Sequence, residues 1–117
     1  MATKNENSTR FYSDKQEKQI CKLLGATQQI NSGASKFSKG DCVQKEANML
    51  IEAKTVTTNK DSFSVKKEWL EKNEKEAKTQ RLYNYCLAFN FGPDQSNYFI
   101  INERLMKYLV EKLKEEE

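Results

Sequence analysis

The chain has 117 residues, 32% of them charged, with a formal net charge of +3 and no histidine. The length suits a single domain with its own core, and the lack of histidine excludes His-based triads, His-based zinc sites and imidazole general bases. No apolar run approaches the ~18 residues of a membrane span and no apolar signal segment opens the chain, so we expect a cytoplasmic protein without membrane contact.

Residues 1–12 are polar, and we expect a flexible N-terminal segment followed by one domain over 13–117. A helix is predicted to begin at Tyr12 or Ser13, where apolar residues start to recur at helical spacing. Gly25 is predicted to end this helix, because glycine readily adopts the left-handed conformation of a helix C-terminus.

The predicted helix carries an acidic residue on its apolar side. Glu17, Ile20, Cys21 and Leu24 follow the i, i+3, i+4, i+7 spacing of one helical face, which places the Glu17 carboxylate on the buried stripe. Two interpretations are open at this point. Glu17 either borders the stripe and turns outward to water, or faces acidic residues elsewhere in the domain.

The sequence contains three cysteines, Cys21, Cys42 and Cys86. Their number is odd and they lack C-x-x-C spacing. Each lies in an apolar neighbourhood, so we expect buried free thiols.

A short strand is predicted over 27–31, followed by a polar loop over 31–40 that contains two glycines. The glycine spacing and the residues that follow exclude a Walker loop. Small hydroxyl side chains, exposed amides and lysines nevertheless suit contact with phosphate. The candidates for DNA contact in this loop are Ser32, Ser35, Lys36 and Lys39.

The strongest functional signal is a predicted hairpin that contains Asp41 and, after the apolar run Met49–Ile51, Glu52 and Lys54. Side chains alternate along a strand, so Glu52 and Lys54 share one face. Burying this pair beside Asp41 is costly unless a divalent cation compensates the carboxylates. We therefore predict that Asp41, Glu52 and the carbonyl of Ala53 bind Mg²⁺, with Mn²⁺ as a substitute, and that Lys54 orients or deprotonates an attacking water.

A second Glu-x-Lys copy, Glu76-Ala77-Lys78, lies in a Lys/Glu-rich stretch with helical character. We interpret its charged side chains as facing water. The copy at Glu52 differs because it follows an apolar run, precedes β-branched residues and has Gly-Asp upstream at hairpin distance. An exposed hairpin with incidental charges is the alternative interpretation.

An amphipathic helix is predicted over 64–78, with Trp69 among its apolar residues. Its remaining lysines are ordinary surface residues. Lys66 and Lys67 lie at its N-terminal end, nearest the predicted site, and are predicted to contact DNA phosphates.

Alternating aromatic residues predict a strand over 81–91, and a Gly-Pro-Asp turn returns the chain as a hairpin partner over 97–101. The aromatic side chains are interpreted as core more readily than as base-stacking platforms. Asn102 suits the N-cap of a last helix, whose apolar stripe either covers the sheet or pairs with a second subunit.

Asp41 on one strand, a hairpin and Glu52-x-Lys54 on the next strand resemble the PD-(D/E)xK nuclease superfamily, with Gly40 where the family name has Pro. The resemblance implies a restriction-endonuclease-like core. The order of predicted elements agrees, because it describes an α/β domain with a central mixed β-sheet flanked by helices.

A narrower resemblance covers residues 13–91 and adds Glu17, the Ser-Gly-Ala and Lys-Gly-Asp stretches and Trp69. This set is similar to the small Holliday-junction resolvases of archaea and their phage-borne relatives. The similarity implies that Glu17 completes the active site and that a loop serine, Ser32 or Ser35, is functional. It also implies a Mg²⁺-dependent endodeoxyribonuclease that acts on branched DNA, in the host cytoplasm if phage-encoded; we expect it to work as a homodimer.

Other functions stay open. A restriction-type or repair nuclease of the same fold is the closest alternative. A catalytically inactive DNA-binding phage protein would have the same charge pattern, although the complete Asp, Glu and Lys set argues against it. The basic charge in the middle of the chain favours a DNA partner in each of these interpretations.

Overall fold

The computed structural model describes residues 3–29 and 41–116 of the chain. They form a five-stranded mixed sheet with three helices, which confirms the predicted α/β class. The helices are α1 (Thr3–Leu24), α2 (Lys67–Thr79) and α3 (Glu103–Glu115). The strands are β1 (Thr27–Gln28), β2 (Asp41–Gln44), β3 (Met49–Ala53), β4 (Asn84–Phe89) and β5 (Tyr98–Ile100).

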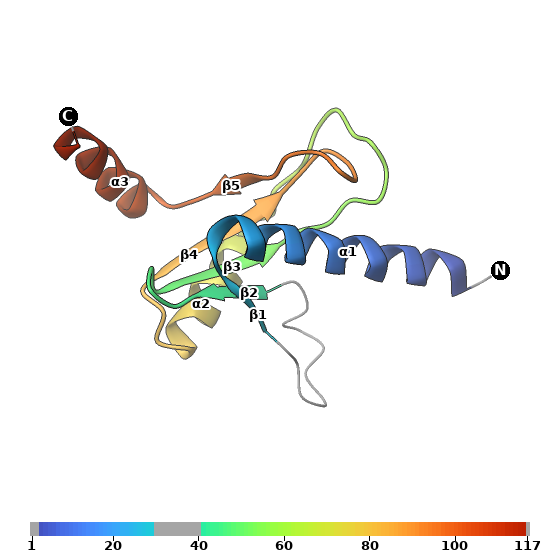
Figure 1. The fold of residues 1–117 in the computed structure, drawn as a ribbon, viewed down its shortest axis with the longest axis horizontal. Coiled ribbons are helices and arrows are strands. Elements are labelled where there is room, and N and C mark those ends of the chain that lie inside the picture. Colours follow the sequence, from blue (N-terminus) through green and yellow to red (C-terminus); the bar gives the residue numbers. More distant parts are fainter. Residues whose placement is uncertain (1–2, 30–40, 117) are drawn as a thin grey trace.

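The strands lie in sequence order, β1-β2-β3-β4-β5. β3 and β4 are parallel, and the other neighbouring pairs are antiparallel. A parallel pair cannot be joined by a tight turn, so the chain crosses over between them, and α2 is that crossover. α1 and α2 consequently cover opposite faces of the sheet (Figure 1).

α1 and α2 each pack on a separate apolar cluster, because successive side chains of a strand point to opposite faces of the sheet. The larger cluster lies under α1 and contains Ile20, Cys42, Ile51, Ala53, Cys86 and Ala88. The smaller one lies under α2 and contains Val43, Leu50 and Ala77, with Leu82 and Tyr85 against it. Residues such as Ile51 and Leu50 each contribute ~1.5–3 kcal/mol by leaving water.

The N-terminal part of α1 corrects the expected helix start, because the helix begins at Thr3 rather than near Ser13. Polarity alone suggested a loose segment, yet these residues include no proline or glycine to break a helix. Ser13 is not an N-cap; its hydroxyl donates a hydrogen bond to Glu17 within the helix. The predicted C-terminus is correct, since Gly25 has φ of 64° and ends the helix.

Several other elements are shorter than predicted. The first strand is described only over Thr27–Gln28, and α2 begins at Lys67 rather than at 64. β4 spans Asn84–Phe89 instead of 81–91, because Arg81 has a positive φ of 62° that ends the helix before it. The returning strand β5 pairs antiparallel with β4 as predicted.

The three thiols are free, as expected. Cys42 and Cys86 are buried, whereas Cys21 is only partly buried and its sulfur lies 3.1 Å from that of Cys42. Burial raises the pKa of the Cys86 thiol to about 12, so this side chain behaves as an apolar core residue.

The last helix stands away from the sheet. Asn102 is its N-cap, as predicted: the side chain accepts a hydrogen bond from the Leu105 amide at 2.9 Å and donates one to the Tyr85 hydroxyl, also at 2.9 Å. Only Leu105 of α3 is buried, and the helix projects beyond the end of the sheet (Figure 1). Its apolar residues Met106, Leu109, Val110 and Leu113 are exposed. Of the two predicted roles, covering the sheet is therefore wrong.

Over residues 3–29 and 41–116, no helix has both the length and the apolar character that crossing a bilayer requires.

Candidate active site

Asp41 and Glu52 form a directly opposed pair in the β2–β3 ladder. Residues in register point to the same face, so both carboxylates lie on the side of the sheet that α2 covers, with Val43 and Leu50. Asp41 is only 2% exposed, and the Glu52 side chain is 17% exposed. The sequence placed this pair on one hairpin, and the register brings the two residues together.

The Asp41 carboxyl is held in its neutral form by its surroundings. Burial is the largest cause and, with the negative charge of Glu52 next, raises the pKa of Asp41 from 3.8 to about 8. Glu76 adds to the rise through its charge and a side-chain hydrogen bond, and Glu17 contributes least. Clustered carboxylates that share protons in this way are also the groups that a divalent cation would stabilise as anions.

Glu76 is the site residue that the sequence analysis missed. Its interpretation as a side chain facing water is wrong, because the Glu76 carboxyl lies against Asp41. The interpretation is right for Lys78, which makes an exposed ion pair with Glu74 at 3.2 Å. Glu76 lies seven residues after Trp69 on α2, so helical periodicity would have placed it on the face that meets the sheet.

Lys54 joins the acidic pair to an aromatic ring. Its Nζ lies 2.9 Å from Oε2 of Glu52 and 4.3 Å from the centroid of the Trp69 ring. The ammonium group is therefore held between a carboxylate and a π face, which fixes its position better than an exposed ion pair does. Ala53, the predicted carbonyl ligand, ends β3 between Glu52 and Lys54.

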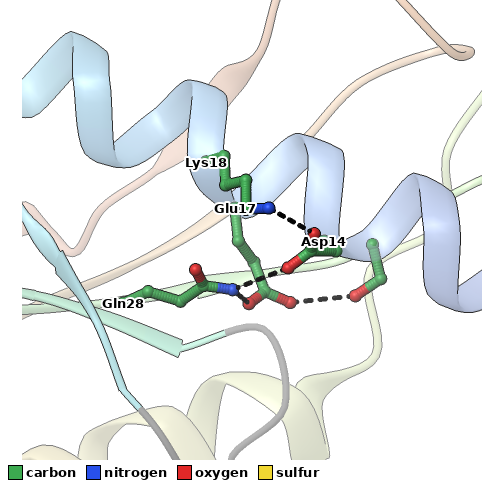
Figure 2. A network of polar contacts seen from close by, with 5 residues as sticks. Asp14, Glu17, Lys18 and Gln28 are labelled. Atoms are coloured by element: carbon green, nitrogen blue, oxygen red, sulfur yellow. Dashed lines mark hydrogen bonds and ion pairs between the residues drawn. The ribbon is translucent and has the colours of Figure 1, made fainter.

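Glu17 is buried, as its place on the apolar stripe predicted, with 5% exposure. Figure 2 shows its carboxylate pointing from α1 towards Gln28 of β1. It accepts hydrogen bonds from Ser13 at 2.9 Å and from Gln28 at 2.6 Å. Burial raises the pKa of Glu17; these two hydrogen bonds oppose the rise, and the charge of Asp14 adds to it.

The Glu17 carboxylate approaches the site from the other side of the sheet. Gln28 pairs with Cys42 in the ladder, so it shares the α1 face, whereas Asp41 points to the α2 face. The negative charge of Glu17 therefore raises the pKa of Asp41 from the opposite face of the sheet.

Two of the residues predicted to contact DNA lie where α2, the helix over the acidic pair, begins. Lys66 and Lys67 are exposed at the N-terminal end of α2, as predicted, and Nζ of Lys66 is 5.8 Å from the Trp69 centroid. The remaining candidates lie outside the described residues. They are Ser32, Ser35, Lys36 and Lys39.

Asn73 is an unexpected buried polar residue on α2. It is 2% exposed, and its Nδ2 has no hydrogen-bond partner among residues 3–29 and 41–116. Trp69, Asn73 and Ala77 are four residues apart and share the helix face that meets the sheet. Because Trp69 lies against Lys54 and Ala77 packs with Leu50, Asn73 faces the part of β3 between them. The unsatisfied donor therefore lies over the strand that carries Glu52.

The donor set suits a divalent cation chemically. Carboxylates and a backbone carbonyl are the hard oxygen ligands that Mg²⁺ and Mn²⁺ take. Burial and the neighbouring carboxylates raise the pKa of Asp41, and a divalent cation would offset both effects. Within residues 3–29 and 41–116, however, no three or more acidic or cysteine side chains converge in a metal-binding arrangement. In the described structure Glu52 is paired with Lys54, so its carboxylate is directed towards the lysine.

Comparisons with protein-family models, curated proteins and solved structures gave no match to this chain.

The buried acid gives a stability prediction in the absence of divalent cations. The pKa of Asp41 is higher in the folded protein than in the unfolded chain, so the folded protein binds more protons between about pH 4 and about pH 8. The free energy of unfolding should therefore fall as pH rises through this range, by on the order of 5 kcal/mol. Asp41→Asn should remove most of this fall, as measured by denaturant unfolding in a chelator.

Burial also raises the pKa of Glu17, which is present in both wild type and Asp41→Asn. The variant should therefore still show a smaller fall in the free energy of unfolding as pH rises. Equal falls in wild type and Asp41→Asn would contradict the assignment.

The buried Asn73 amide gives a second prediction. Asn73→Leu keeps the branched shape of the side chain and removes a buried donor that has no partner in the described part of the chain. The variant should be more stable by about 1–2 kcal/mol in thermal unfolding. A loss of stability in both Asn73→Leu and Asn73→Ala would show that the amide has a structural partner.

Proposed function

We propose that this protein is a metal-dependent endonuclease that hydrolyses phosphodiester bonds in DNA. The observation that carries the proposal is the arrangement of Asp41 directly opposite Glu52, with the Lys54 ammonium 2.9 Å from the Glu52 carboxylate. Two carboxylates that can hold a divalent cation, with a lysine beside them, are one set of groups that can carry out phosphodiester hydrolysis without histidine. The resemblance to PD-(D/E)xK nucleases noted from the sequence adds to this proposal.

In this proposal Asp41, Glu52 and the carbonyl of Ala53 hold Mg²⁺, or Mn²⁺ in its place. The bound cation supplies charge stabilisation to the phosphate as negative charge develops on it. Lys54 orients or deprotonates the attacking water and offsets charge on the phosphorane. Glu76 lies against Asp41 and is positioned to fix its orientation, and Glu17 contributes negative charge from the other face of the sheet.

The substrate we propose is DNA, and branched DNA in particular. Exposed lysines next to the acidic pair favour a polyanion, because Lys66 and Lys67 begin the helix that covers it. The preference for a four-way junction rests on the sequence resemblance to resolvases. In-line attack would leave a 5′-phosphate and a 3′-hydroxyl.

The decisive measurement is cleavage of a labelled four-way junction and of a matched duplex, each with Mg²⁺ and with a chelator. Asp41→Asn, Glu52→Gln and Lys54→Ala should each lower the rate by on the order of 100-fold or more. The first two keep the shape of the side chain and remove its charge, so DNA binding should persist.

Lys78→Ala is the matched control, because Lys78 occupies the lysine position of the second Glu-x-Lys copy and is paired only with Glu74 on the surface. It should cleave like wild type. Equal losses in Lys54→Ala and Lys78→Ala would exclude the assigned role of Lys54. Duplex cleavage equal to junction cleavage would favour a repair-type nuclease, and binding without any cleavage would favour an inactive DNA-binding protein.

The working form we propose is a two-fold dimer, because resolving a junction needs symmetric cuts in two strands and each chain has one candidate site. The exposed apolar face of α3 suits a second copy of the same helix. α3 has Glu103 in its first turn and Lys112 and Lys114 in its last turn, so an antiparallel pair brings opposite charges together.

Light scattering should therefore report about twice the chain mass of 13.6 kDa. Leu109→Lys places a charge in the apolar face and should give a monomer, whereas Glu111→Gln on the polar side of α3 should not change the mass. A wild-type monomer that makes paired cuts in a junction would contradict the dimer.

A further inference from the structure

A row of aromatic rings runs from the acidic pair towards the β5 edge of the sheet. We call Phe63, Trp69, Phe89, Phe91 and Tyr98 the aromatic row. Trp69 lies 6.1 Å from Phe63, centroid to centroid, and Phe63 stacks on Phe89 at 4.5 Å. Phe89 in turn contacts Phe91 at 5.5 Å and Tyr98 at 5.9 Å.

The aromatic row lies on the same face of the sheet as the candidate site. Phe89 is two residues beyond Leu87, which pairs with Glu52, and Tyr98 lies opposite Phe89 in the next strand. Lys54 connects the two features, since its ammonium group contacts both Glu52 and the ring of Trp69. A molecule bound along the row would therefore reach the candidate site.

The row is not part of the core. None of its members belongs to the two buried apolar clusters, and Tyr98 is 56% exposed. β5 is an edge strand, and α3 projects away beyond it instead of covering this face (Figure 1). Aromatic surface that is left open beside a polar site is typical of a binding surface.

Positive charge accompanies the aromatic row. The backbone amide of Lys60 donates to the carbonyl of Phe91 at 2.7 Å, and Nζ of Lys66 lies 5.8 Å from the Trp69 centroid. Lys60, Lys66 and Lys67 are exposed and make no ion pair with another described residue. Asp61 and Glu68 are the acidic neighbours in this segment, so the three lysines outnumber the two acids.

We infer that the aromatic row binds unpaired nucleotides of DNA, with a base stacked on Tyr98 and the backbone phosphates contacted by Lys60 and Lys66. Every base has a π face that stacks on an aromatic ring, and lysines beside such a platform attract the backbone without reading sequence. Bases inside a continuous duplex are already stacked on one another, so this surface favours strands that are unpaired. The inference rests on the proposed action on DNA and narrows it to substrates with unpaired nucleotides next to the scissile bond.

The test is binding of a fluorescein-labelled oligo-dT and of a matched duplex, measured by anisotropy in a chelator so that no cleavage occurs. Tyr98→Ala should weaken oligo-dT binding about tenfold, the effect of losing one stacked base. Tyr98→Trp keeps a stacking ring and should bind like wild type. A 2-aminopurine placed in the oligo-dT should change its fluorescence on binding to wild type and not to Tyr98→Ala.

Tyr108→Ala is the matched control, because Tyr108 is 54% exposed on α3, away from the row. It should not change the affinity. Lys66→Ala should weaken binding to all DNA and reduce the salt dependence by about one phosphate contact.

Equal affinities for Tyr98→Ala and Tyr108→Ala would overturn the inference, as would equal loss of duplex and oligo-dT binding in Tyr98→Ala. A Tyr98→Ala protein that changes from dimer to monomer would also overturn it, since the row would then be an interface between copies of the chain. The two proposals fail separately. If wild type cleaves DNA and Tyr98→Ala binds oligo-dT as wild type does, only the stacking inference is overturned. If a base stacks on Tyr98 but no Mg²⁺-dependent cleavage occurs, only the proposed hydrolase activity is overturned.

Discussion

The antiparallel register of β2 and β3 sets Asp41 against Glu52, and the rest of the structure accommodates that pairing. Two carboxylates on one face of a sheet repel each other, and burial under a helix adds the cost of removing them from water. Without a metal the protein meets this cost by leaving Asp41 protonated and by bringing a lysine to Glu52. Structural stability alone would be served better by apolar residues at these positions.

The parallel pairing of β3 and β4 determines what lies over the carboxylates. It requires a crossover, and the crossover helix α2 passes over the same face. This one helix supplies the Trp69 ring that holds Lys54, the buried amide of Asn73 and the Glu76 carboxyl. The topology of the sheet therefore assembles the candidate site from segments that are far apart in the sequence.

The β5 end of the sheet is more exposed than the acidic pair under α2. Where α2 begins, the face is left to half-buried rings and exposed lysines, and α3 leaves the edge strand uncovered. In the function we propose, the buried acidic centre carries out the chemistry at a phosphate, and the partly exposed aromatic and basic surface beside it holds the surrounding nucleotides.

Local patterns in the sequence determined much of this protein. The alternation around Glu52 and Lys54, the glycine at 25, the N-cap at Asn102 and the apolar spacing around Glu17 depend on neighbours within one turn or one strand, and each was correct. Tertiary structure decided the rest, because it depends on which segments meet. The charged sequence around Glu76 is typical of an exposed helix, and only the packing of α2 on the sheet brings the Glu76 carboxyl to Asp41. In the same way, alternating aromatic residues predict a core strand, and Cys86, Leu87 and Ala88 of β4 are indeed buried. The Phe89 ring at the end of β4 is only partly buried, and Tyr98 on the edge strand β5 is exposed, because no further strand pairs beyond β5 in the described sheet.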